Sequence, residues 1–211
     1  MPALSQSWQF WALASAIFAA LTAIFAKVGV SGINSDFATL IRAFAKLTHR
    51  RARLVIMGKG PEQRALETLA QDLGVADRVL LPGYCNEPWS WYDRAKCLAV
   101  SSRTESFGNV IVEAMAHGLP VVATACAGPN EILDRGRYGT IVRISDAAAL
   151  AAGIDAALSS PGDPEPRRRR AAEFSFASRF PAYAALIGEV VAETPLQPAK
   201  LGKRSVATTL A

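Results

Sequence analysis

Five short apolar segments recur along the chain with helical segments between them, and this alternation constrains the fold more than any other feature. The apolar segments are LVIMG at 54–58, VLLPG at 79–83, CLAVSS at 97–102, PVVAT at 120–124 and GTIVRI at 139–144. Windows with helical periodicity separate them at 61–73, 89–96, 109–117 and 147–158, and another, FATLIRAFAKL, precedes them at 37–47. Apolar strands that alternate with amphipathic helices predict an α/β fold, with a parallel sheet and helices on both of its faces.

The chain has three regions. With 211 residues, of which 51% are hydrophobic, it is long enough for one substantial core, which we place at residues 36–193. Residues 1–35 form an apolar N-terminal region. Residues 194–211 have no periodic apolar face, and we expect them to be a disordered tail.

The N-terminal region contains WQFWALASAIFAALTAIFA at 8–26, a stretch without a charged residue. Its length suits a helix that spans or binds a membrane, and a helix buried in the protein is the alternative. A signal peptide is disfavoured because no Lys or Arg precedes the apolar stretch. If the segment spans, the basic residues from Lys27 onward place the rest of the chain in the cytoplasm, attached to the inner membrane.

Composition disfavours several classes of function. The formal charge of +5 gathers at 50–53 and 167–170 without interleaved aromatics, so we predict a solvated face or a weak attraction to anionic lipid, and no nucleic-acid partner. The three cysteines, Cys85, Cys97 and Cys126, are an odd count without metal-ligand spacing. Two of them fall in apolar runs, where we expect a reduced, buried thiol. Because His49 and His117 lie in no paired ligand pattern, we predict neither a metal site nor a histidine-based triad.

Two glutamates flank a Phe-Gly-Asn turn in the stretch SRTESFGNVIVEAMAHGLPVVAT at 102–124. Glu105 stands in the loop that leaves the third strand, and ligands of such sheets bind at the carboxyl ends of the strands. We expect Ser106 to cap a helix that begins near Phe107, with its free backbone N–H groups facing the ligand. Gly108 would let a phosphate approach the backbone closely.

On that helix we expect a buried stripe and a ligand face. The stripe consists of Val110, Ile111, Ala114 and Met115. Asn109 and Glu113 lie one turn apart on another face, where a carboxylate can accept hydrogen bonds from two sugar hydroxyls. Spacing alone leaves two readings of Glu113 open, a ligand contact or a solvent-facing helix residue. Glu105 could equally be an acidic residue that the helix dipole favours.

These residues resemble the group 1 family of retaining, family 4-like glycosyltransferases with the GT-B fold. The matching text is LVIMGKGPEQRALETLAQDLGVADRVLLPGY, then AVSSRTESFGNVIVEAMAHGLPVVAT, then GPNEIL and YGTIVRI, in family order and spacing within residues 37–191. The resemblance implies that residues 36–193 are a Rossmann-like domain, the C-terminal half of a GT-B fold. In the family this half binds a nucleotide-sugar donor, such as a UDP- or GDP-sugar.

The resemblance also assigns roles to residues. Glu113 would hold the ribose hydroxyls, and Glu105 would contact the donor sugar as the catalytic carboxylate. The other donor-binding residues that it implies are Arg103, Phe107, Gly108 and Asn109, with Gly58, Gly60, Gly83 and Tyr84 beside the nucleotide. Such enzymes transfer the sugar with retention. They need no metal or other cofactor, because basic side chains and a helix N-terminus stabilise the departing diphosphate.

The sequence departs from the family in two places. The acceptor-binding half has no counterpart, so transfer would need an acceptor domain supplied by a partner chain. The first donor-domain strand, which normally ends in a Gly-Arg turn followed by Lys-Gly, is not recognisable in KVGVSGINSD at 27–36. Because that strand is central in the family's sheet, its loss would leave strand edges unpaired. AIFAKVGV at 23–30 could replace it, although its alanine content favours a helix.

Residues 1–35 are similar instead to the first membrane helix of EamA-type drug/metabolite transporters, and the two resemblances meet near TLIRAF. The chain therefore has the character of a fusion or of a truncated enzyme. The alternative function is a membrane-attached protein that binds a nucleotide sugar or another protein without catalysis. A third alternative is a product that folds poorly.

Overall fold

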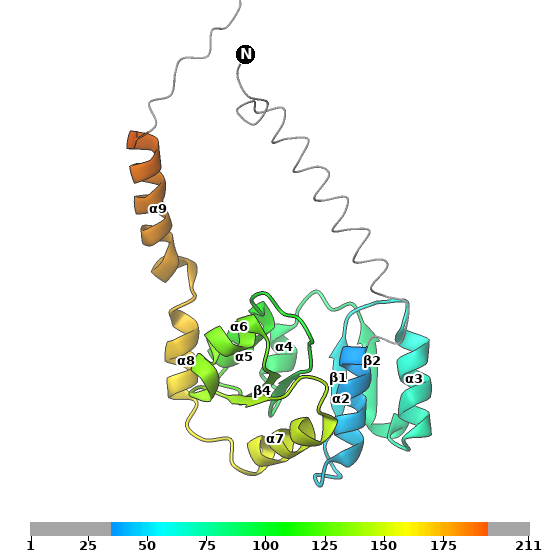
Figure 1. Cartoon of the computed structure of the whole chain (residues 1–211). Coiled ribbons are helices and arrows are strands. Elements are labelled where there is room, and N and C mark those ends of the chain that lie inside the picture. Colours follow the sequence, from blue (N-terminus) through cyan, green and yellow to red (C-terminus); the bar gives the residue numbers. More distant parts are fainter. Residues whose placement is uncertain (1–34, 194–211) are drawn as a thin grey trace, which may run out of the picture. The chain divides into compact units, whose positions relative to one another are not determined.

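The structure is a computed structural model that describes residues 35–193. The chain divides into two compact units, residues 1–171 and 172–211. The elements, shown in Figure 1, are α2 (Ser35–Lys46), β1 (Leu54–Met57), α3 (Gln63–Asp72), η2 (Ala76–Arg78), β2 (Val79–Gly83), α4 (Trp89–Tyr92), β3 (Leu98–Val100), α5 (Asn109–Ala116), β4 (Val121–Thr124), α6 (Ala127–Ile132), η3 (Asp134–Gly136), β5 (Thr140–Val142), α7 (Ala147–Ser159), α8 (Glu165–Ala172) and α9 (Phe176–Glu193). The membrane segment predicted at 8–26 and the tail predicted at 194–211 lie outside the described residues.

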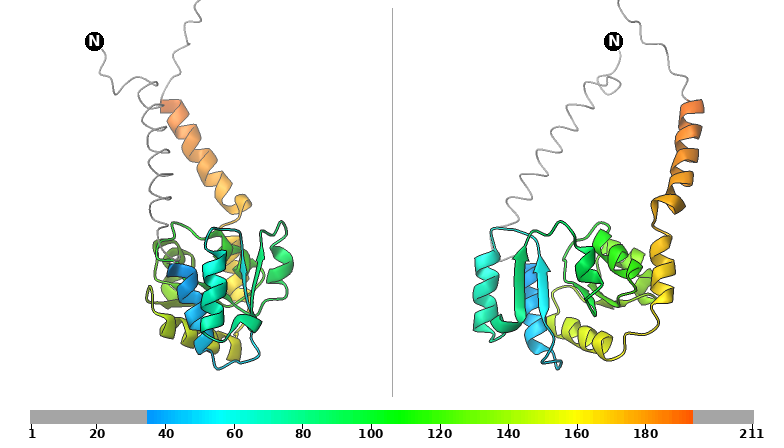
Figure 2. Two further views of the ribbon diagram at one scale, coloured as in Figure 1. Left: turned by 90° about the vertical axis from the view of Figure 1, so that its right-hand side faces the viewer. Right: turned by 180° about the vertical axis from the view of Figure 1, so that it is seen from behind.

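The five predicted strands are present, and each is parallel to its neighbours. β1 pairs with β2, with Leu54 opposite Val79. β4 lies between β3 and β5, with Val122 opposite Ala99 on one side and Thr140 on the other. Helices lie on both sides of the strands (Figure 2), so the predicted α/β class is confirmed.

The strands form two ladders rather than the single sheet that we predicted. One ladder contains β1 and β2, and the other contains β3, β4 and β5. Every β4 residue is buried, whereas the apolar residues of β1 and β3 are mostly only half-buried. β1 and β3 are therefore edge strands among the residues that the structure describes. This is the unpaired condition expected where a central strand is missing.

Helix boundaries agree closely with the sequence periodicity. α3 begins two residues later than predicted and ends before Gly74, as predicted. Gly74 has a φ of +66°, which lets the next N–H, that of Val75, reach the Ala70 carbonyl at 2.9 Å. α4 is a single turn rather than the eight-residue window predicted around it.

Helix α2 packs against α7, and this pair forms the centre of the core. The buried side chains here are Ile41 and Phe44 of α2, Leu47 directly after it, and Leu150 and Ile154 of α7. Gly153 brings α7 close to the strands, because a Cβ at this position would stand only 2.8 Å from Val122 Cγ1 on β4. The helix pair and β4 therefore fix one another's positions.

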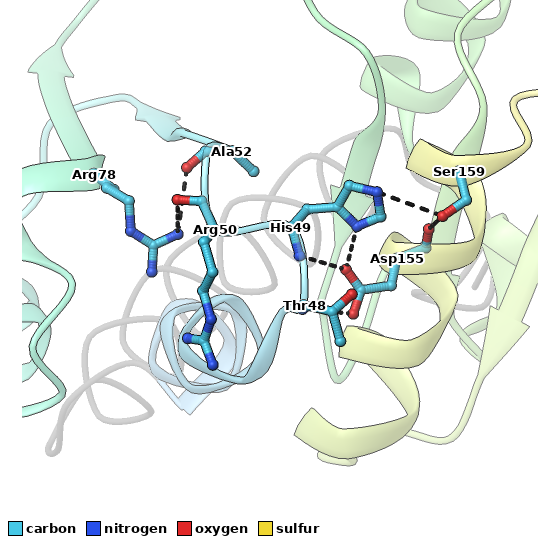
Figure 3. Close-up of polar contacts among 7 residues, drawn as sticks. All are labelled: Thr48, His49, Arg50, Ala52, Arg78, Asp155 and Ser159. Atoms are coloured by element: carbon cyan, nitrogen blue, oxygen red, sulfur yellow. Dashed lines mark hydrogen bonds and ion pairs between the residues drawn. The ribbon is translucent and has the colours of Figure 1, made fainter.

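Asp155 on α7 holds the segment that follows α2 (Figure 3). Its Oδ2 accepts the Thr48 backbone N–H at 2.8 Å, and its Oδ1 accepts the His49 N–H at 3.3 Å. The same Oδ1 lies 2.6 Å from His49 Nδ1. Burial alone would raise the pKa of Asp155, but these hydrogen bonds outweigh it and lower the pKa to about 2.

The second unit contains α9, whose large apolar side chains are exposed. They are Phe176, Phe180, Tyr183, Leu186 and Ile187. The spacing of Phe176, Phe180, Tyr183 and Ile187 places these four on one helix face. Between residues 35 and 193, no helix is both long enough and apolar enough to cross a membrane.

Substituting Asp155→Asn should weaken the junction between α2 and α7, because the charge that the two N–H groups and the imidazole stabilise is lost. We expect the free energy of unfolding at pH 7 to fall by about 1–2 kcal/mol, measured by urea denaturation. As a control, Asp72→Asn at the exposed end of α3 should change it by less than about 0.5 kcal/mol.

The pH dependence of stability gives a second readout of the same junction. The pKa of Asp155 is lower in the folded chain than in the unfolded chain, so its contribution is complete above about pH 4. The contribution disappears as the pH falls towards its folded pKa of about 2. The unmodified chain should therefore lose stability over this range more steeply than Asp155→Asn, and equal slopes would contradict the assignment.

Candidate functional site

The loop that follows β3 is held from two sides. The Ser102 carbonyl accepts hydrogen bonds from the Thr124 hydroxyl at the end of β4 and from the Cys126 thiol, the latter at 2.9 Å. On the other side, the Ser101 hydroxyl donates to the Asp36 carbonyl at the start of α2, at 2.7 Å. The loop that carries Glu105 is therefore fixed by both of its neighbouring elements.

Helix α5 begins later than predicted, and its cap is not Ser106. The N-cap residue is Gly108, with φ +102° and ψ +61°, and the first helical residue is Asn109 rather than Phe107. A glycine is needed here because residues with a side chain are strained at this positive φ. A Cβ would also meet Ile111 Cδ1 at 3.2 Å. The prediction failed because cap preference was read from side-chain chemistry alone, whereas backbone conformation decides this turn.

The buried stripe of α5 is narrower than predicted. Ile111, Ala114 and Met115 are fully buried, whereas Val110 is 43% exposed. Successive residues of a helix point about 100° apart. Because α5 packs mainly against α6 and β4, only Ile111 and the residues three and four positions after it reach the core. Val110 therefore adds an apolar side chain to the exposed surface beside the turn.

Glu113 is half-buried on α5, and a tyrosine orients it. The Tyr92 hydroxyl of α4 donates to Glu113 Oε2 at 2.9 Å. Burial, reinforced by this hydrogen bond to a carboxylate, raises the pKa of Tyr92, so its phenol stays protonated and remains the donor. Within residues 36–189, Glu113 Oε1 has no hydrogen-bond partner. The sequence reading missed Tyr92, because only the tertiary fold brings together two residues that lie 21 positions apart.

Tyr92 is itself held by a neighbour at the end of α5. The His117 ring lies 5.4 Å from the Tyr92 ring, centroid to centroid. His117 Nδ1 in turn lies 2.7 Å from Asp93 Oδ1. The orientation of Glu113 therefore depends on a small cluster of α4 and α5 residues rather than on one contact.

Helix α6 lies against the glutamate loop, although no helix was predicted there. The Gly128 N–H donates to the Glu105 carbonyl at 3.0 Å. A Cβ at Gly128 would overlap the Phe107 carbonyl, so only glycine permits this approach. Gly128 and Pro129 stand in the first turn of α6 and hide its periodicity, which is why the sequence did not indicate a helix.

A second group of predicted residues lies where β1 and β2 end. The Gly58 N–H donates to the Gly83 carbonyl at 2.8 Å, and both glycines have positive φ, +123° and +80°. Lys59 crosses Gly83, with its Cε 3.3 Å from the position that a Cβ would occupy. Gly60 has open space beside it, and Tyr84 is 72% exposed. The backbone at Gly58 and Gly60 is therefore accessible to a ligand, whereas Gly83 is buried.

Arg103 contacts the protein itself. Its Nε donates to Asp36 Oδ1 at 3.2 Å, and its side chain remains 55% exposed. The contact ties the loop after β3 to the start of α2, next to the bond that Ser101 makes. Arg103 can retain this position and still present its outer guanidinium nitrogens to an anion.

The two glutamates are half-buried. Neither Glu105 nor Glu113 lines any of three cavities of about 500 Å³ in the part of the chain that the structure describes. Glu105, Phe107, Gly108, Asn109 and Glu113 are brought together by one loop and one helix. Gly58, Gly60, Gly83 and Tyr84 form a separate group on the other ladder.

Both histidines have carboxylate partners, and His49 also has a serine nearby. Ser159 Oγ lies 3.4 Å from His49 Nε2, and Asp155 binds the opposite ring nitrogen (Figure 3). The Ser159 hydroxyl donates to the Asp155 carbonyl at 2.8 Å, so its proton points away from the imidazole. The serine also ends a helix, where carbonyls rather than N–H groups are free to face a ligand. The cluster therefore serves as a structural junction.

The three cysteines are free thiols, of which Cys126 is buried and Cys85 and Cys97 are half-buried. Burial raises the pKa of Cys97 to about 12, so this thiol stays protonated at neutral pH. Within residues 36–189, no group of three His, Cys, Asp or Glu side chains is arranged to hold a metal ion.

Fold and site together define a class of protein. It is an α/β domain of parallel strands with a glutamate-bearing turn at the strand ends. The profile of the family described as "Glycosyl transferases group 1" matches residues 21–175. The chain belongs to this glycosyltransferase family, as the sequence resemblance implied.

Two relatives cover different lengths of the chain. The lipopolysaccharide core biosynthesis glycosyltransferase LpsE of Rhizobium meliloti (strain 1021) is 38% identical over 122 residues, which are 58% of this chain and 35% of that protein. An uncharacterized transporter in the cobO 3' region of Sinorhizobium sp is 85% identical over 39 residues, which are 18% of this chain and 28% of that protein. The chain thus spans about a third of the length of the curated relatives that it matches.

Solved structures support the same fold. Sucrose-phosphate synthase from Thermosynechococcus elongatus superposes with a TM-score of 0.69 at 28% identity, over 76% of this chain and 43% of that chain. Anabaena HepE, solved in complex with UDP, superposes with a TM-score of 0.62 at 24% identity, over 74% of this chain and 44% of that chain. The predicted GT-B-type fold is therefore confirmed for the described domain.

Gly128→Ala should disturb the site locally, because the added methyl group would overlap the Phe107 carbonyl. We expect a loss of about 2 kcal/mol in the free energy of unfolding, measured by urea denaturation. Gly60→Ala is the matched control, since a Cβ there meets nothing within 4 Å. A Gly128→Ala variant as stable as the control would show that the contact between α6 and the loop is not tight.

Proposed function

We propose that this chain is the donor-binding half of a glycosyltransferase that transfers a sugar from a nucleotide-sugar donor, with retention and without a metal. The observation that carries the proposal is the orientation of Glu113 by Tyr92, at 2.9 Å, beside the glycine-capped start of α5. A helix residue with no ligand to meet gains little from a buried phenol dedicated to its carboxylate.

Glu113 would hold the ribose. A carboxylate can accept hydrogen bonds from both hydroxyls of a diol, and Oε1 of Glu113 is available for this purpose. Tyr92 occupies Oε2 and stays neutral, so it fixes the carboxylate without cancelling its charge. Glu105 would contact the donor sugar as the catalytic carboxylate, from a loop whose backbone Gly128 holds at 3.0 Å.

The diphosphate would lie at the start of α5, near Phe107, Gly108 and Asn109. A helix N-terminus attracts anions, and the glycine cap lets the phosphate oxygens approach the backbone. Arg103 would add a positive charge next to this position, and a group of this kind takes the place of a metal in stabilising the leaving group. Gly58, Gly60, Gly83 and Tyr84 would border the nucleotide. The UDP bound to HepE makes UDP the first ligand to test.

Transfer would need an acceptor domain from a partner chain. The donor half would supply one wall of a cleft, with the half-buried Glu105 and Glu113 on that wall. The exposed apolar face of α9 supports the existence of a partner, because contiguous apolar surface of this kind is typical of a protein interface.

The second candidate is a membrane-attached protein that binds a nucleotide sugar or another protein without catalysis, on the cytoplasmic side. It is favoured by the apolar segment at 8–26 and by the short, 85% identical match to an uncharacterized transporter. Vesicle flotation tests it directly. A chain that stays at the bottom of the gradient, with or without anionic lipid, would exclude the attachment.

Donor binding is the central test. Calorimetry with a panel of nucleotides should detect binding of UDP or of a UDP- or GDP-sugar. The affinity for this ligand should be unchanged by EDTA. Glu113→Ala should weaken binding at least about tenfold, since a charged hydrogen-bond acceptor is lost. Glu67→Ala, on the exposed face of α3, should leave affinity unchanged. A folded sample that binds no member of the panel would contradict the proposal.

Tyr92→Phe tests the role of the phenol separately. Removing the hydroxyl frees the Glu113 carboxylate to rotate but leaves its charge, so we expect affinity to fall about threefold to tenfold. The loss of affinity should be smaller than in Glu113→Ala. Equal affinity in Tyr92→Phe and the unmodified chain would show that the phenol does not position the carboxylate.

A further inference from the structure

Helix α9 is uncovered in the part of the chain that the structure describes. Every residue from 175 to 189 is exposed. A helix without tertiary contacts is only marginally stable in water, because most helical stability in proteins comes from the packing of an apolar face. Pro181 weakens α9 further, since a proline inside a helix removes one backbone hydrogen bond. The apolar face of α9 therefore needs a partner.

The apolar face has the spacing with which two helices pair. Phe176, Phe180, Tyr183 and Ile187, which we call the α9 seam, follow one another at intervals of four, three and four residues. This alternation is the a/d pattern of helices that pack side by side. The rings of Phe176 and Phe180 already stack on each other, with their centroids 4.7 Å apart. The spacing therefore fits another helix as the partner.

The intervals of the α9 seam read the same in both directions. If two copies of α9 run antiparallel about a two-fold axis, Phe180 of each copy meets Tyr183 of the other. In the same register, Phe176 of each copy meets Ile187 of the other. All four residues are then in register and each contact forms twice, as in an isologous interface. The α9 seam is therefore complementary to itself.

The residues beside the seam suit a close approach. Ala177 and Ala184 each follow a seam residue and stand on one flank, where their small side chains admit a second helix. Leu186 stands on the other flank and adds an apolar side chain that is 57% exposed. Pro181 follows Phe180 by one residue, so it projects away from the seam and does not obstruct the pairing.

The exposed apolar area is sufficient for a small dimer interface. The four seam residues and Leu186 are between 52% and 77% exposed. A buried aromatic side chain removes about 150–250 Å² from water. Three aromatic and two aliphatic residues from each copy therefore offer about 1,000 Å² to a symmetric pair, which is the lower bound for a specific interface.

Charge is compatible with the antiparallel pair. Arg179 and Glu189 are the charged residues between 176 and 189, and both stand on the flank of Leu186. Side chains lean toward the N-terminus of their own helix. Arg179 of one copy and Glu189 of the other therefore lean toward each other, whereas the two Arg179 side chains lean apart. The contribution is small because both residues are exposed.

We propose that two copies of this chain associate through antiparallel α9 helices, with the α9 seam of each copy buried against that of the other. A membrane surface fits this helix less well, because interfacial helices have a basic polar face and Arg179 is the one cation between 176 and 189. The dimer would occupy the face of α9 that also suits a partner with an acceptor domain, so the two associations would exclude each other. The inference concerns assembly and does not depend on donor binding.

Sedimentation equilibrium of the full chain tests the proposal without any nucleotide. We expect a reversible equilibrium between the 22.5 kDa monomer and a particle of twice that mass. An interface of this size should give a dissociation constant of about 1–100 μM. A chain that is still monomeric at about ten times the upper concentration would overturn the proposal.

Tyr183→Glu tests whether the α9 seam holds the copies together. It places a carboxylate opposite Phe180 twice in each dimer, so the dissociation constant should rise at least about 100-fold. Ala185→Glu is the matched control, because it adds the same charge on the opposite face of α9 and should change the constant by less than about threefold. If Tyr183→Glu does not fold, Ile187→Ser should still raise the constant at least about tenfold. A dimer that keeps its affinity in these seam variants would be joined elsewhere, which would overturn the proposal.

Mixed variants test the direction of the two helices. Under mild oxidation, Phe176→Cys chains mixed with Ile187→Cys chains should form a disulfide-linked dimer, because the two positions meet in the antiparallel pair. Each variant alone should not, since its two copies of the position lie about 16 Å apart along the axis, beyond the reach of a disulfide. The unmodified chain, with its three free cysteines, is the control. A disulfide dimer in each variant alone would indicate a parallel pair and contradict the proposal.

Vesicle flotation separates a second copy from a lipid surface as the occupant of α9. Tyr183→Glu should leave flotation with anionic vesicles unchanged, because the seam contacts protein rather than lipid. A monomeric chain that floats with the vesicles and loses flotation in Tyr183→Glu would assign the seam to lipid, and this result would also overturn the proposal.

Discussion

Helix α2 joins two strand ladders that share no strand pairing among the described residues. The segment after it is bound by the Asp155 carboxylate of α7, which also reaches the His49 ring at 2.6 Å. Its start is bound to the loop after β3, through Ser101 at 2.7 Å. Because backbone pairing does not connect the ladders, they are held together by the packing of α2 on α7 and by these hydrogen bonds at the two ends of α2. This helix therefore helps to hold one ladder against the other.

The candidate site inherits its geometry from the same arrangement. The loop that carries Glu105 is bound by α2 on one side and by Thr124 and Cys126 on the other. The close approach of Gly128 then sets the backbone of the loop against α6. α5 continues from that loop and presents Glu113 to Tyr92. Glu105 is thus positioned by backbone contacts of its loop and Glu113 by the Tyr92 hydroxyl, which leaves Oε1 of Glu113 available for a ligand.

Sequence periodicity was sufficient for the five strands and for most of the helices, because apolar runs and amphipathic faces are local signals. Three features of the site did not follow from these signals. The cap at Gly108 depends on a positive φ, which side-chain preference does not report. The helical periodicity of α6 is hidden by Gly128 and Pro129, and the glycine is needed because the helix approaches the Phe107 carbonyl closely. The bond from Tyr92 to Glu113 joins separate elements. The gap between β1 and β3 followed from the family pattern rather than from periodicity, since each edge strand has an ordinary apolar sequence.

Recognition of a donor and transfer of its sugar make different demands on this chain. Ligand pockets commonly bury about 70–90% of the ligand surface, and a single wall with carboxylates at its surface buries much less. The ribose contacts proposed for Glu113 would still give measurable affinity, because a charged acceptor hydrogen-bonds a diol well even when one side is exposed to solvent. Glycosyl transfer additionally needs water to be excluded around the leaving diphosphate, so that the helix N-terminus and Arg103 act at low dielectric. That exclusion requires a second wall. Under the proposed function, donor affinity would therefore be the property that the described domain holds by itself, and catalysis would depend on what covers it.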